Sequence, residues 1–329
     1  MRSRTKRHLT PDALDALLRA SAGTGCRLEQ ELTDGWFNSA YRVRLDDGRP
    51  AVVKIAPRPG APVLRYERGI LGTEAMVYRR IAALPPGAVP APELIHADEE
   101  FIVLSALEGT PWDKADEHLA PGTAQALRHE LGRITARLHS LAPADGRFGY
   151  PAAASGLSAA DWRTAFTAMV EALLEDADRW HSPLAVPARD IRALVHEGGY
   201  ALDEVTEARL VHFDLWPGNI FVRPGDAGQA RITGLIDHER AFWGDPAAEL
   251  VSLAFGGGTG PDSPLLAGYA EAGGSLGPES TRRHREALYR LYLGLLLVVE
   301  CAPRGFGEDH LGFCRRMLSE AVAGLRSLG

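Results

Sequence analysis

The chain has 329 residues, of which 45% are hydrophobic, so it is long enough for about two domains with substantial cores and is not a disordered protein. Its 36 Lys and Arg residues against 43 Asp and Glu residues give a net charge of −7. Because nucleic acids attract basic surfaces, this balance argues against a nucleic-acid partner. The apolar run over residues 291–299 is far too short to cross a bilayer, so we expect no membrane partner either.

Patterns of strand and helix alternate in the first third of the chain. Thr10 as N-cap and Pro11 at the first helical position predict a helix over residues 10–22, as an appendage to the strands after it. A second helix is predicted over residues 65–83. The predicted strands, of which the first three form an antiparallel meander, cover residues 26–32, 38–45, 51–56, 93–96 and 101–105.

The rest of the chain is predicted to be mostly helical. Amphipathic helices are expected over residues 121–141, 160–180, 188–205, 281–301 and 308–327. One group of strands interrupts them, over residues 209–213, 219–222 and 232–236. The composition shifts near residue 107, and turn residues lie at 108–111. We therefore expect two domains, residues 1–107 and residues 108–329.

The cysteines of this chain are Cys26, Cys301 and Cys314. They are odd in number, lie far apart and lack the CxxC spacing of metal sites, so they predict neither a disulfide framework nor a zinc site. Free thiols are typical of a reducing compartment, and we expect a cytoplasmic protein. We expect a monomer or a dimer.

The segment Val-His-Phe-Asp-Leu-Trp-Pro-Gly-Asn over residues 211–219 carries the strongest chemical signal. Asp214 and Asn219 lie five residues apart across a Pro-Gly turn, which can fold a carboxylate and an amide toward one point. The catalytic loop of protein kinases has the same Asp-x-x-x-x-Asn spacing, with a base and a Mg²⁺ ligand at its two ends. The alternative is a solvated turn, since Asp, Pro, Gly and Asn all favour turns.

Three further charged residues stand in apolar surroundings. Asp237 follows an apolar strand directly, where a carboxylate is well placed to bind a divalent cation, although it could also be a helix N-cap. Lys54 lies inside an apolar strand, and Glu74 lies on the apolar stripe of the helix over residues 65–83. Because buried charges are normally paired, we predict an ion pair between Lys54 and Glu74, with Glu67 as the alternative partner.

In this order, these residues resemble the aminoglycoside phosphotransferase and choline kinase-like family, a branch of the protein-kinase-like fold. The resemblance covers residues 26–329. The chain departs from the family pattern at two positions: Phe213 replaces a glycine of the His-Gly-Asp loop, which could alter the loop backbone, and His238 replaces an aromatic residue of the Ile-Asp-aromatic-Glu motif.

The resemblance implies an α+β, bilobal kinase-like fold, with a small antiparallel-sheet lobe that has one main helix and a larger, mostly helical lobe. It implies Mg²⁺ as cofactor, ATP or GTP as phosphoryl donor and a small hydroxylated molecule as acceptor. Asp214 would be the catalytic base and Asn219 and Asp237 the Mg²⁺ ligands, while His212 would support the loop and Asp245 would cap a helix. The residues implied in nucleotide binding are Lys54, Glu74, Ser39 of the phosphate-covering loop, and Ser105 and Leu107 of the hinge.

The acceptor implied first is an aminoglycoside, a related hydroxylated antibiotic or an amino sugar. Acidic side chains such as Glu239 and Glu300 could pair with such a polycation, although most acids only solvate helix surfaces. The Asp-Leu-Trp-x-Gly-Asn form of the loop, with Trp216, also resembles fructosamine kinases, which makes a ketosamine-repair kinase the first alternative. A nucleotide-binding pseudokinase that serves as a partner module is the second.

Overall fold

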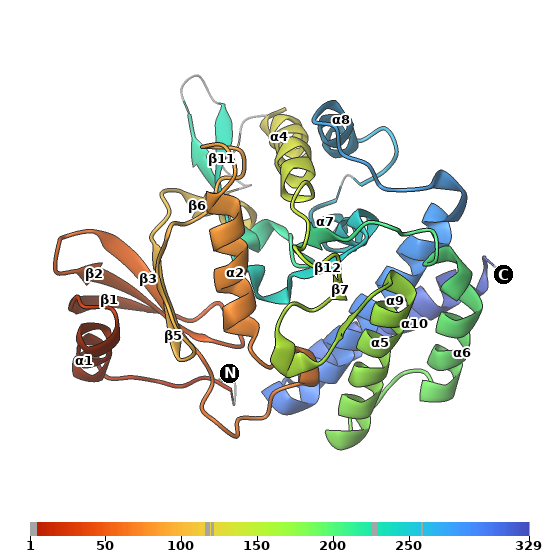
Figure 1. Cartoon of the computed structure of the whole chain (residues 1–329), viewed down its shortest axis with the longest axis horizontal. Coiled ribbons are helices and arrows are strands. Elements are labelled where there is room, and N and C mark those ends of the chain that lie inside the picture. Colours follow the sequence, from red (N-terminus) through yellow and green to blue (C-terminus); the bar gives the residue numbers. More distant parts are fainter. Residues whose placement is uncertain (1–4, 116–118, 120–121, 226–228, 258, 329) are drawn as a thin grey trace.

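The computed structural model describes residues 5–115, 119, 122–225, 229–257 and 259–328 (Figure 1). An antiparallel sheet with two helices forms one end of the molecule, and a larger helical part forms the other. The structure thus contains the sheet-rich and helix-rich parts that the sequence predicts. The functional division of the chain at residue 107 remains a prediction.

The first part is built around a five-stranded sheet in the order β1-β2-β3-β5-β4, in which all neighbours are antiparallel. Its strands are β1 (Cys26–Leu32), β2 (Ser39–Leu45), β3 (Pro50–Ile55), β4 (Leu94–Ala97) and β5 (Phe101–Ser105). Helix α1 (Pro11–Ser21) covers one face of this sheet and α2 (Ile70–Ala82) covers the other (Figure 1).

Side-chain alternation along the strands assigns each residue to one of these two faces. Phe101 and Val103 of β5 pack with α1, whereas Ile102 and Leu104 pack with α2. On β3, Val53 and Ile55 belong to the α1 face. Lys54 lies between them in the sequence and therefore faces α2, where Glu74 is located.

The predicted N-terminal helix is more than an appendage. It begins as predicted, because the Thr10 hydroxyl accepts a hydrogen bond from the Ala13 amide at 3.3 Å and Pro11 comes next. Leu14 and Leu18 are then fully buried against the sheet. Helix α1 therefore belongs to the core of the first part, since without it one sheet face would expose its apolar side chains.

The helical part contains all five predicted long helices. Its helices are α3 (Trp112–Ala115), α4 (Thr123–Leu138), α5 (Trp162–Arg179), α6 (Ala188–Gly198), α7 (Glu249–Leu253), α8 (Pro264–Glu271), α9 (Glu279–Arg304) and α10 (Glu308–Arg326). Helix α6 ends seven residues before the predicted end at residue 205, where a 3₁₀ turn and a loop take its place. Residue 121, the predicted start of the α4 segment, lies outside the described residues. The sequence analysis missed the short helices α3, α7 and α8.

The predicted group of strands divides between two small antiparallel sheets. One has the order β11-β10-β6 and the other β8-β7-β12-β9. The strands are β6 (Thr110–Pro111), β7 (Phe148–Gly149), β8 (Ser158–Ala159), β9 (Arg209–Val211), β10 (Ile220–Pro224), β11 (Ala230–Leu235) and β12 (Phe242–Gly244). The loop that carries Asp214 crosses from one sheet to the other. No helix in the described part of the chain is long and apolar enough to span a membrane.

Candidate active site

The loop between β9 and β10 brings Asp214 and Asn219 together. The Asn219 side-chain amide donates a hydrogen bond to the Asp214 backbone oxygen at 2.9 Å and another to the Asp214 carboxylate at 3.3 Å. Asn219 is buried and Asp214 is half-buried. The five-residue spacing thus folds the amide back onto the carboxylate, and the burial of Asn219 argues against a solvated turn.

His212 connects this loop to the end of β11. Its Nδ1 accepts a hydrogen bond from the Asp214 amide at 3.2 Å, so Nε2 carries the proton and donates to the Ile236 carbonyl at 2.9 Å. Both ring nitrogens are thereby occupied within the protein. The structure supports the loop-supporting role implied for His212 and places the Asp214 loop beside Asp237, which is the residue after Ile236.

A buried carboxylate at the start of α7 fixes the loop backbone. Glu249 accepts hydrogen bonds from the His212 amide at 2.7 Å and from the Phe213 amide at 2.9 Å. The Ser252 hydroxyl donates to Glu249 at 2.9 Å and itself accepts from the Leu215 amide at 3.2 Å. Burial opposes ionisation of Glu249, but the contact with the His139 ring at 3.5 Å, together with His212, outweighs it and holds the pKa of this carboxyl below its ordinary value. Because Glu249 lies 37 residues after His212, the sequence alone does not indicate this anchoring role.

Phe213 occupies the glycine position of the family's loop with a left-handed backbone. Its φ is 62°, in the left-handed region that favours glycine. The ring is fully buried, with its centroid 5.1 Å from that of Phe242 and 5.6 Å from that of Tyr292. Aromatic packing and the hydrogen bond to Glu249 hold Phe213 in this left-handed conformation.

Lys54 is the centre of a charged cluster. Its Nζ lies 2.7 and 2.8 Å from the two carboxylate oxygens of Glu74 and 2.7 Å from the Asp237 carboxylate. Burial disfavours the charged lysine, but Asp237 and Glu74 outweigh it and raise the pKa of Lys54 well above its ordinary value. The predicted pair of Lys54 and Glu74 is confirmed. The alternative partner, Glu67, instead accepts from Arg304 at 2.6 Å.

Glu74, Asp237 and Glu239 form a group of oxygen donors. One carboxylate oxygen from each lies within 4.8 Å of the others. Hard cations such as Mg²⁺ prefer oxygen ligands, so this donor set fits that ion. Asn219 approaches the same strand end, because its backbone carbonyl accepts from the Ile236 amide at 3.0 Å. Glu239, predicted to bind the acceptor, thus lies with the lysine and the candidate metal ligands.

Arg240 connects Asp214 to helix α9. Its Nη1 lies 3.2 Å from the Asp214 carboxylate, while its Nη2 lies 2.9 and 3.0 Å from the two oxygens of Glu300. Glu300 is buried and also accepts from Arg304 and Tyr66. Its carboxylate is therefore occupied inside the protein and acts on Asp214 through Arg240. Sequence analysis missed Arg240, which comes directly after the Ile-Asp-His-Glu motif.

This environment changes the acidity of Asp214. Burial, opposed by Arg240, raises the pKa of its carboxyl to about 6. The side chain is ionised at neutral pH but is a stronger base than an exposed aspartate. The fixed position and raised basicity suit it to accept a proton from a hydroxyl group.

The other predicted nucleotide-binding residues have different surroundings. Ser39 is buried, and its hydroxyl has no hydrogen-bond partner among the described residues. The Ser105 hydroxyl accepts from the Glu93 amide at 2.9 Å, so this side chain is used within the sheet. Leu107 packs over Gly234, where a Cβ atom would lie 2.3 Å from the leucine. Nucleotide contacts by these residues remain predictions.

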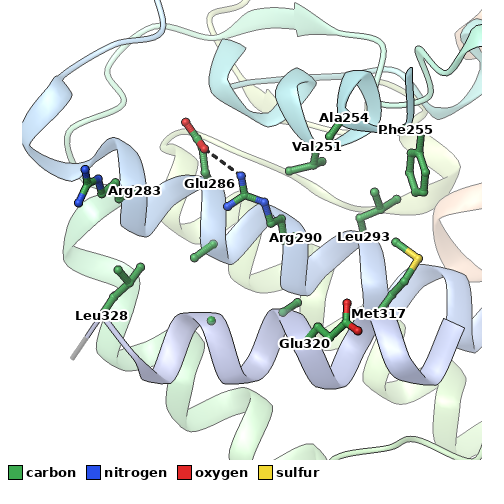
Figure 2. A pocket seen from close by; sticks show the side chains of 13 residues that line it. Val251, Ala254, Phe255, Arg283, Glu286, Arg290, Leu293, Met317, Glu320 and Leu328 are labelled. Atoms are coloured by element: carbon green, nitrogen blue, oxygen red, sulfur yellow. Dashed lines mark hydrogen bonds and ion pairs between the residues drawn. The ribbon is translucent and has the colours of Figure 1, made fainter. Parts of the chain in front are cut away.

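A cavity of about 530 Å³ lies outside the Asp214 group, between the α7 region, α9 and α10 (Figure 2). Apolar side chains such as Phe255, Leu293 and Met317 line it together with Arg290 and Glu286, which form an ion pair at 3.1 Å. None of the predicted catalytic or metal-binding residues lines this cavity, so it receives no catalytic assignment.

Comparison with known families identifies the chain. The profile of the family described as "Phosphotransferase enzyme family" matches residues 28–287, which is most of the sequence. The chain belongs to this phosphotransferase family. No curated protein sequence shows significant similarity to it.

Solved structures confirm the kinase-like fold of this phosphotransferase. A thermostable mutant of aminoglycoside phosphotransferase APH(4)-Ia, in complex with AMP-PNP and hygromycin B, matches with a TM-score of 0.61 at 18% identity and covers 94% of this chain and 98% of its own. A protein of Thermobifida fusca YX-ER1, provisionally described as a fructosamine-3-kinase, has a TM-score of 0.64 at 19% identity, over 96% and 99%. The macrolide 2′-phosphotransferase MphH of Brachybacterium faecium has a TM-score of 0.54 at 22% identity, over 93% and 98%.

Proposed function

We propose that this phosphotransferase is a small-molecule kinase that transfers the γ-phosphate of ATP or GTP to a hydroxyl of an aminoglycoside, a related hydroxylated antibiotic or an amino sugar. The observation that carries the proposal is the position of Asp214. Asn219 and Arg240 hold its carboxylate, and the His212 side chain of its loop bonds to Ile236, the residue before Asp237. A base, oxygen ligands and a lysine are the groups that phosphoryl transfer requires.

Asp214 orients the acceptor hydroxyl and receives its proton as the new phosphate ester bond forms. Its raised pKa, about 6, leaves it ionised at neutral pH and increases its affinity for that proton. Arg240 fixes the carboxylate in one orientation through a 3.2 Å contact. The protein thereby supplies position more than covalent chemistry, as direct phosphoryl transfer needs.

Asn219 and Asp237 would hold Mg²⁺, which when bound neutralises charge on the transferred phosphate. Lys54 binds the phosphate oxygens of the nucleotide, and Glu74 positions the lysine from the fully buried side of the pair. Asp237 lies between the proposed metal site and the proposed phosphate site, because its carboxylate contacts Lys54 at 2.7 Å. The Ser39 hydroxyl, which lacks a partner among the described residues, is available to donate to a phosphate oxygen.

The acceptor class rests on the similarity in fold. The neighbouring structures include one with hygromycin B and one described as a macrolide 2′-phosphotransferase. The charge of Glu300 gives no independent support, because two arginines already neutralise it. A ketosamine is the second candidate, favoured by the Trp216 side chain, which is 40% exposed two residues after Asp214 and can stack on a sugar or an aromatic aglycone.

The test is acceptor-dependent release of ADP or GDP. The purified protein with Mg²⁺ and either nucleotide is assayed against aminoglycosides, macrolides, ketosamines and choline, and ³¹P NMR identifies the phosphate ester product. We expect turnover with an antibiotic or amino sugar, and a loss of about 10²–10⁴-fold in kcat for Asp214→Asn. Asp203→Asn is the matched control at an exposed position, with its carboxylate paired only at the surface to Arg163, and should keep the wild-type rate.

The outcomes separate the candidate functions. Turnover with ketosamines alone would support the repair kinase. Nucleotide binding without turnover on any acceptor would contradict the proposed kinase and favour the partner module. A wild-type rate for Asp214→Asn would remove this residue from the mechanism.

A further inference from the structure

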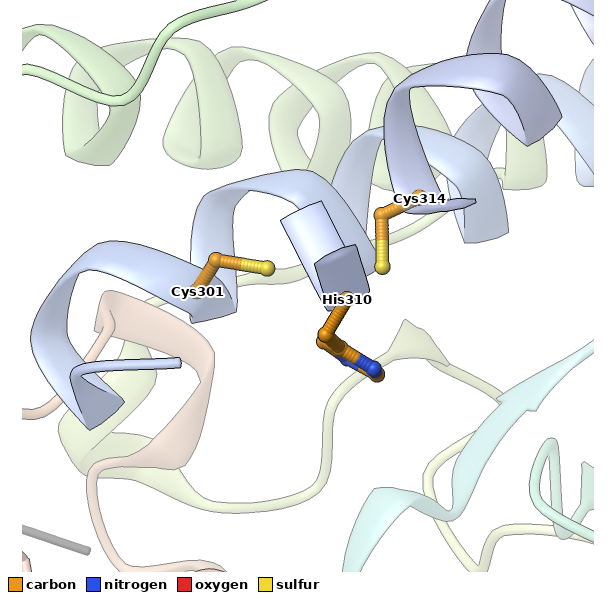
Figure 3. A group of neighbouring side chains, drawn as sticks. All are labelled: Cys301, His310 and Cys314. Carbon is orange, nitrogen blue, oxygen red and sulfur yellow. The ribbon is translucent and has the colours of Figure 1, made fainter. Parts of the chain in front are cut away.

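Two cysteines and a histidine meet where the chain passes from α9 into α10 (Figure 3). Cys301 comes from the last turns of α9, and His310 and Cys314 come from the first turns of α10. One ring nitrogen of His310 and the two sulfur atoms all lie within 4.8 Å of one another. Their spacing in the sequence predicts no zinc site, because the three residues do not form a CxxC-type motif.

Helix geometry explains why the three side chains converge. His310 and Cys314 are four residues apart on one helix and therefore lie on the same face. Gly305, with a φ of 70°, ends α9 in the left-handed conformation and lets the chain reverse into α10. The two helices pack along each other, which returns α10 to the level of Cys301. Sequence spacing alone does not show this, because the ligands come from two elements.

We propose that Cys301, His310 and Cys314 form a binding site for a zinc-class divalent cation. Thiolate and imidazole are the ligands that such borderline-soft ions prefer, and three protein ligands leave one tetrahedral position for water. A Zn–S distance of about 2.3 Å sets two sulfur ligands about 3.8 Å apart. The observed spread of up to 4.8 Å thus needs only small side-chain rotations, about 1 Å, to close around the ion. Each thiol releases its proton to solvent when the metal binds.

The surroundings suit a stabilising metal site. Both sulfur ligands are buried, Cys301 at 3% and Cys314 at 0% exposure, whereas His310 is exposed and gives the ion access from solvent. The Cys301 thiol donates to the Leu297 carbonyl at 3.2 Å and lies beside the Cys314 thiol.

The site also touches the loop between β1 and β2. Phe306, in the turn that the metal would brace, packs edge-on against His310 with centroids 4.7 Å apart. The same ring also contacts Trp36 of that loop, with centroids 4.9 Å apart. A bound cation would therefore fix the turn after α9 and the aromatic contact that supports the loop. The metal site itself does not depend on the proposed kinase function.

The test uses Co²⁺ and Zn²⁺ added to the reduced, full-length protein. Co²⁺ bound by thiolates gives a sulfur-to-metal charge-transfer absorption, which distinguishes this site from the oxygen donors around Asp237. We expect one Co²⁺ per chain with this absorption, displaced by Zn²⁺, and a rise in melting temperature as Zn²⁺ saturates the site. Cys301→Ser and Cys314→Ala should abolish the absorption. His310→Gln should weaken Co²⁺ binding at least about tenfold. Removing a residue that merely hydrogen-bonds to a metal ligand already lowers metal affinity by about 10–100-fold, and His310 is itself a proposed ligand.

Cys26→Ser is the matched control, because Cys26 is a buried thiol in β1 outside the cluster, and it should bind Co²⁺ like the wild type. A wild-type protein that takes up Co²⁺ without the sulfur absorption would place the ion elsewhere and overturn the proposal. No uptake by the reduced wild type would overturn it as well. This holds even if Cys301→Ser and Cys314→Ala fail to fold, because the wild-type measurement stands alone.

Discussion

Substitution of Phe213 tests which of two opposed effects controls the stability of the catalytic loop. Its left-handed backbone, with φ of 62°, costs an L-amino acid about 1–2 kcal/mol that glycine would not experience. Its fully buried ring, however, packs against Phe242 and Tyr292, and removing such a side chain costs about 3–5 kcal/mol. The cavity effect is the larger of the two.

We therefore expect Phe213→Gly to lower the free energy of unfolding by about 2–4 kcal/mol, although it restores the residue typical of the family. This range includes the greater freedom of glycine in the unfolded chain, worth about 0.4–1 kcal/mol. Phe213→Ala is the matched control, because it creates nearly the same cavity but keeps the backbone strain. It should be less stable than the glycine variant by about 0.5–1 kcal/mol.

The measurement is urea denaturation monitored by far-ultraviolet circular dichroism and tryptophan fluorescence, with the same slope for all variants so that stabilities can be compared. A Phe213→Gly protein as stable as the wild type would show that packing against Phe242 contributes little. An alanine variant at least as stable as the glycine variant would show that the backbone is not strained at this position.

The other predictions concern charged residues. Glu74→Gln should leave Lys54 paired with Asp237 alone and so raise the Mg²⁺ concentration needed for half-maximal turnover. The double variant Glu74→Gln with Lys54→Ala should be little slower than Lys54→Ala alone. If the losses of the two single variants add in full, the two residues act independently. The pKa of Glu249 is lower in the folded state than its ordinary value of about 4.5, so as the pH falls the unfolded state takes up the proton before the folded state does. The free energy of unfolding should therefore decrease from about pH 4.5 down to the pKa of the folded state. Glu249→Gln should therefore flatten this acid limb in melting curves, and an unchanged slope would contradict the assignment. Glu300→Gln should lower the free energy of unfolding by about 3–5 kcal/mol, because it leaves two buried arginines without their counter-charge. If urea titrations show a change below about 1 kcal/mol, water takes the place of the carboxylate beside the arginines.

The sequence predicts best what depends on local periodicity. Lys54 and Glu74 interrupt apolar patterns of period 2 and 3.6, and each pattern states which way the side chain points, so their pairing could be predicted. The five-residue spacing of Asp214 and Asn219 is likewise local. The long helices are predictable for the same reason, whereas strands of two residues, such as β7 and β8, are too short to carry a pattern.

Contacts between distant segments are what the sequence does not predict. Glu249 reaches the amide of His212, 37 residues before it, and only the folded chain shows that its carboxylate anchors the loop. Glu300 was expected to face an acceptor because it is acidic. Its partners Arg240 and Arg304 are supplied by packing, and charge alone cannot identify them. Cys301 and Cys314 are also brought together by the packing of two helices, which their spacing in the sequence does not show.

The position of Lys54 between Val53 and Ile55 has a consequence for how the sheet assembles. A slip of β3 by one residue would turn every side chain to the opposite face and place the lysine against Leu14 and Leu18 of α1, where no carboxylate of the Glu74 group can reach it. An unpaired buried ammonium costs several kcal/mol, so the slipped pairing is strongly disfavoured. The lysine that we expect to bind phosphate therefore also favours the native register of β3 over a shifted register during folding.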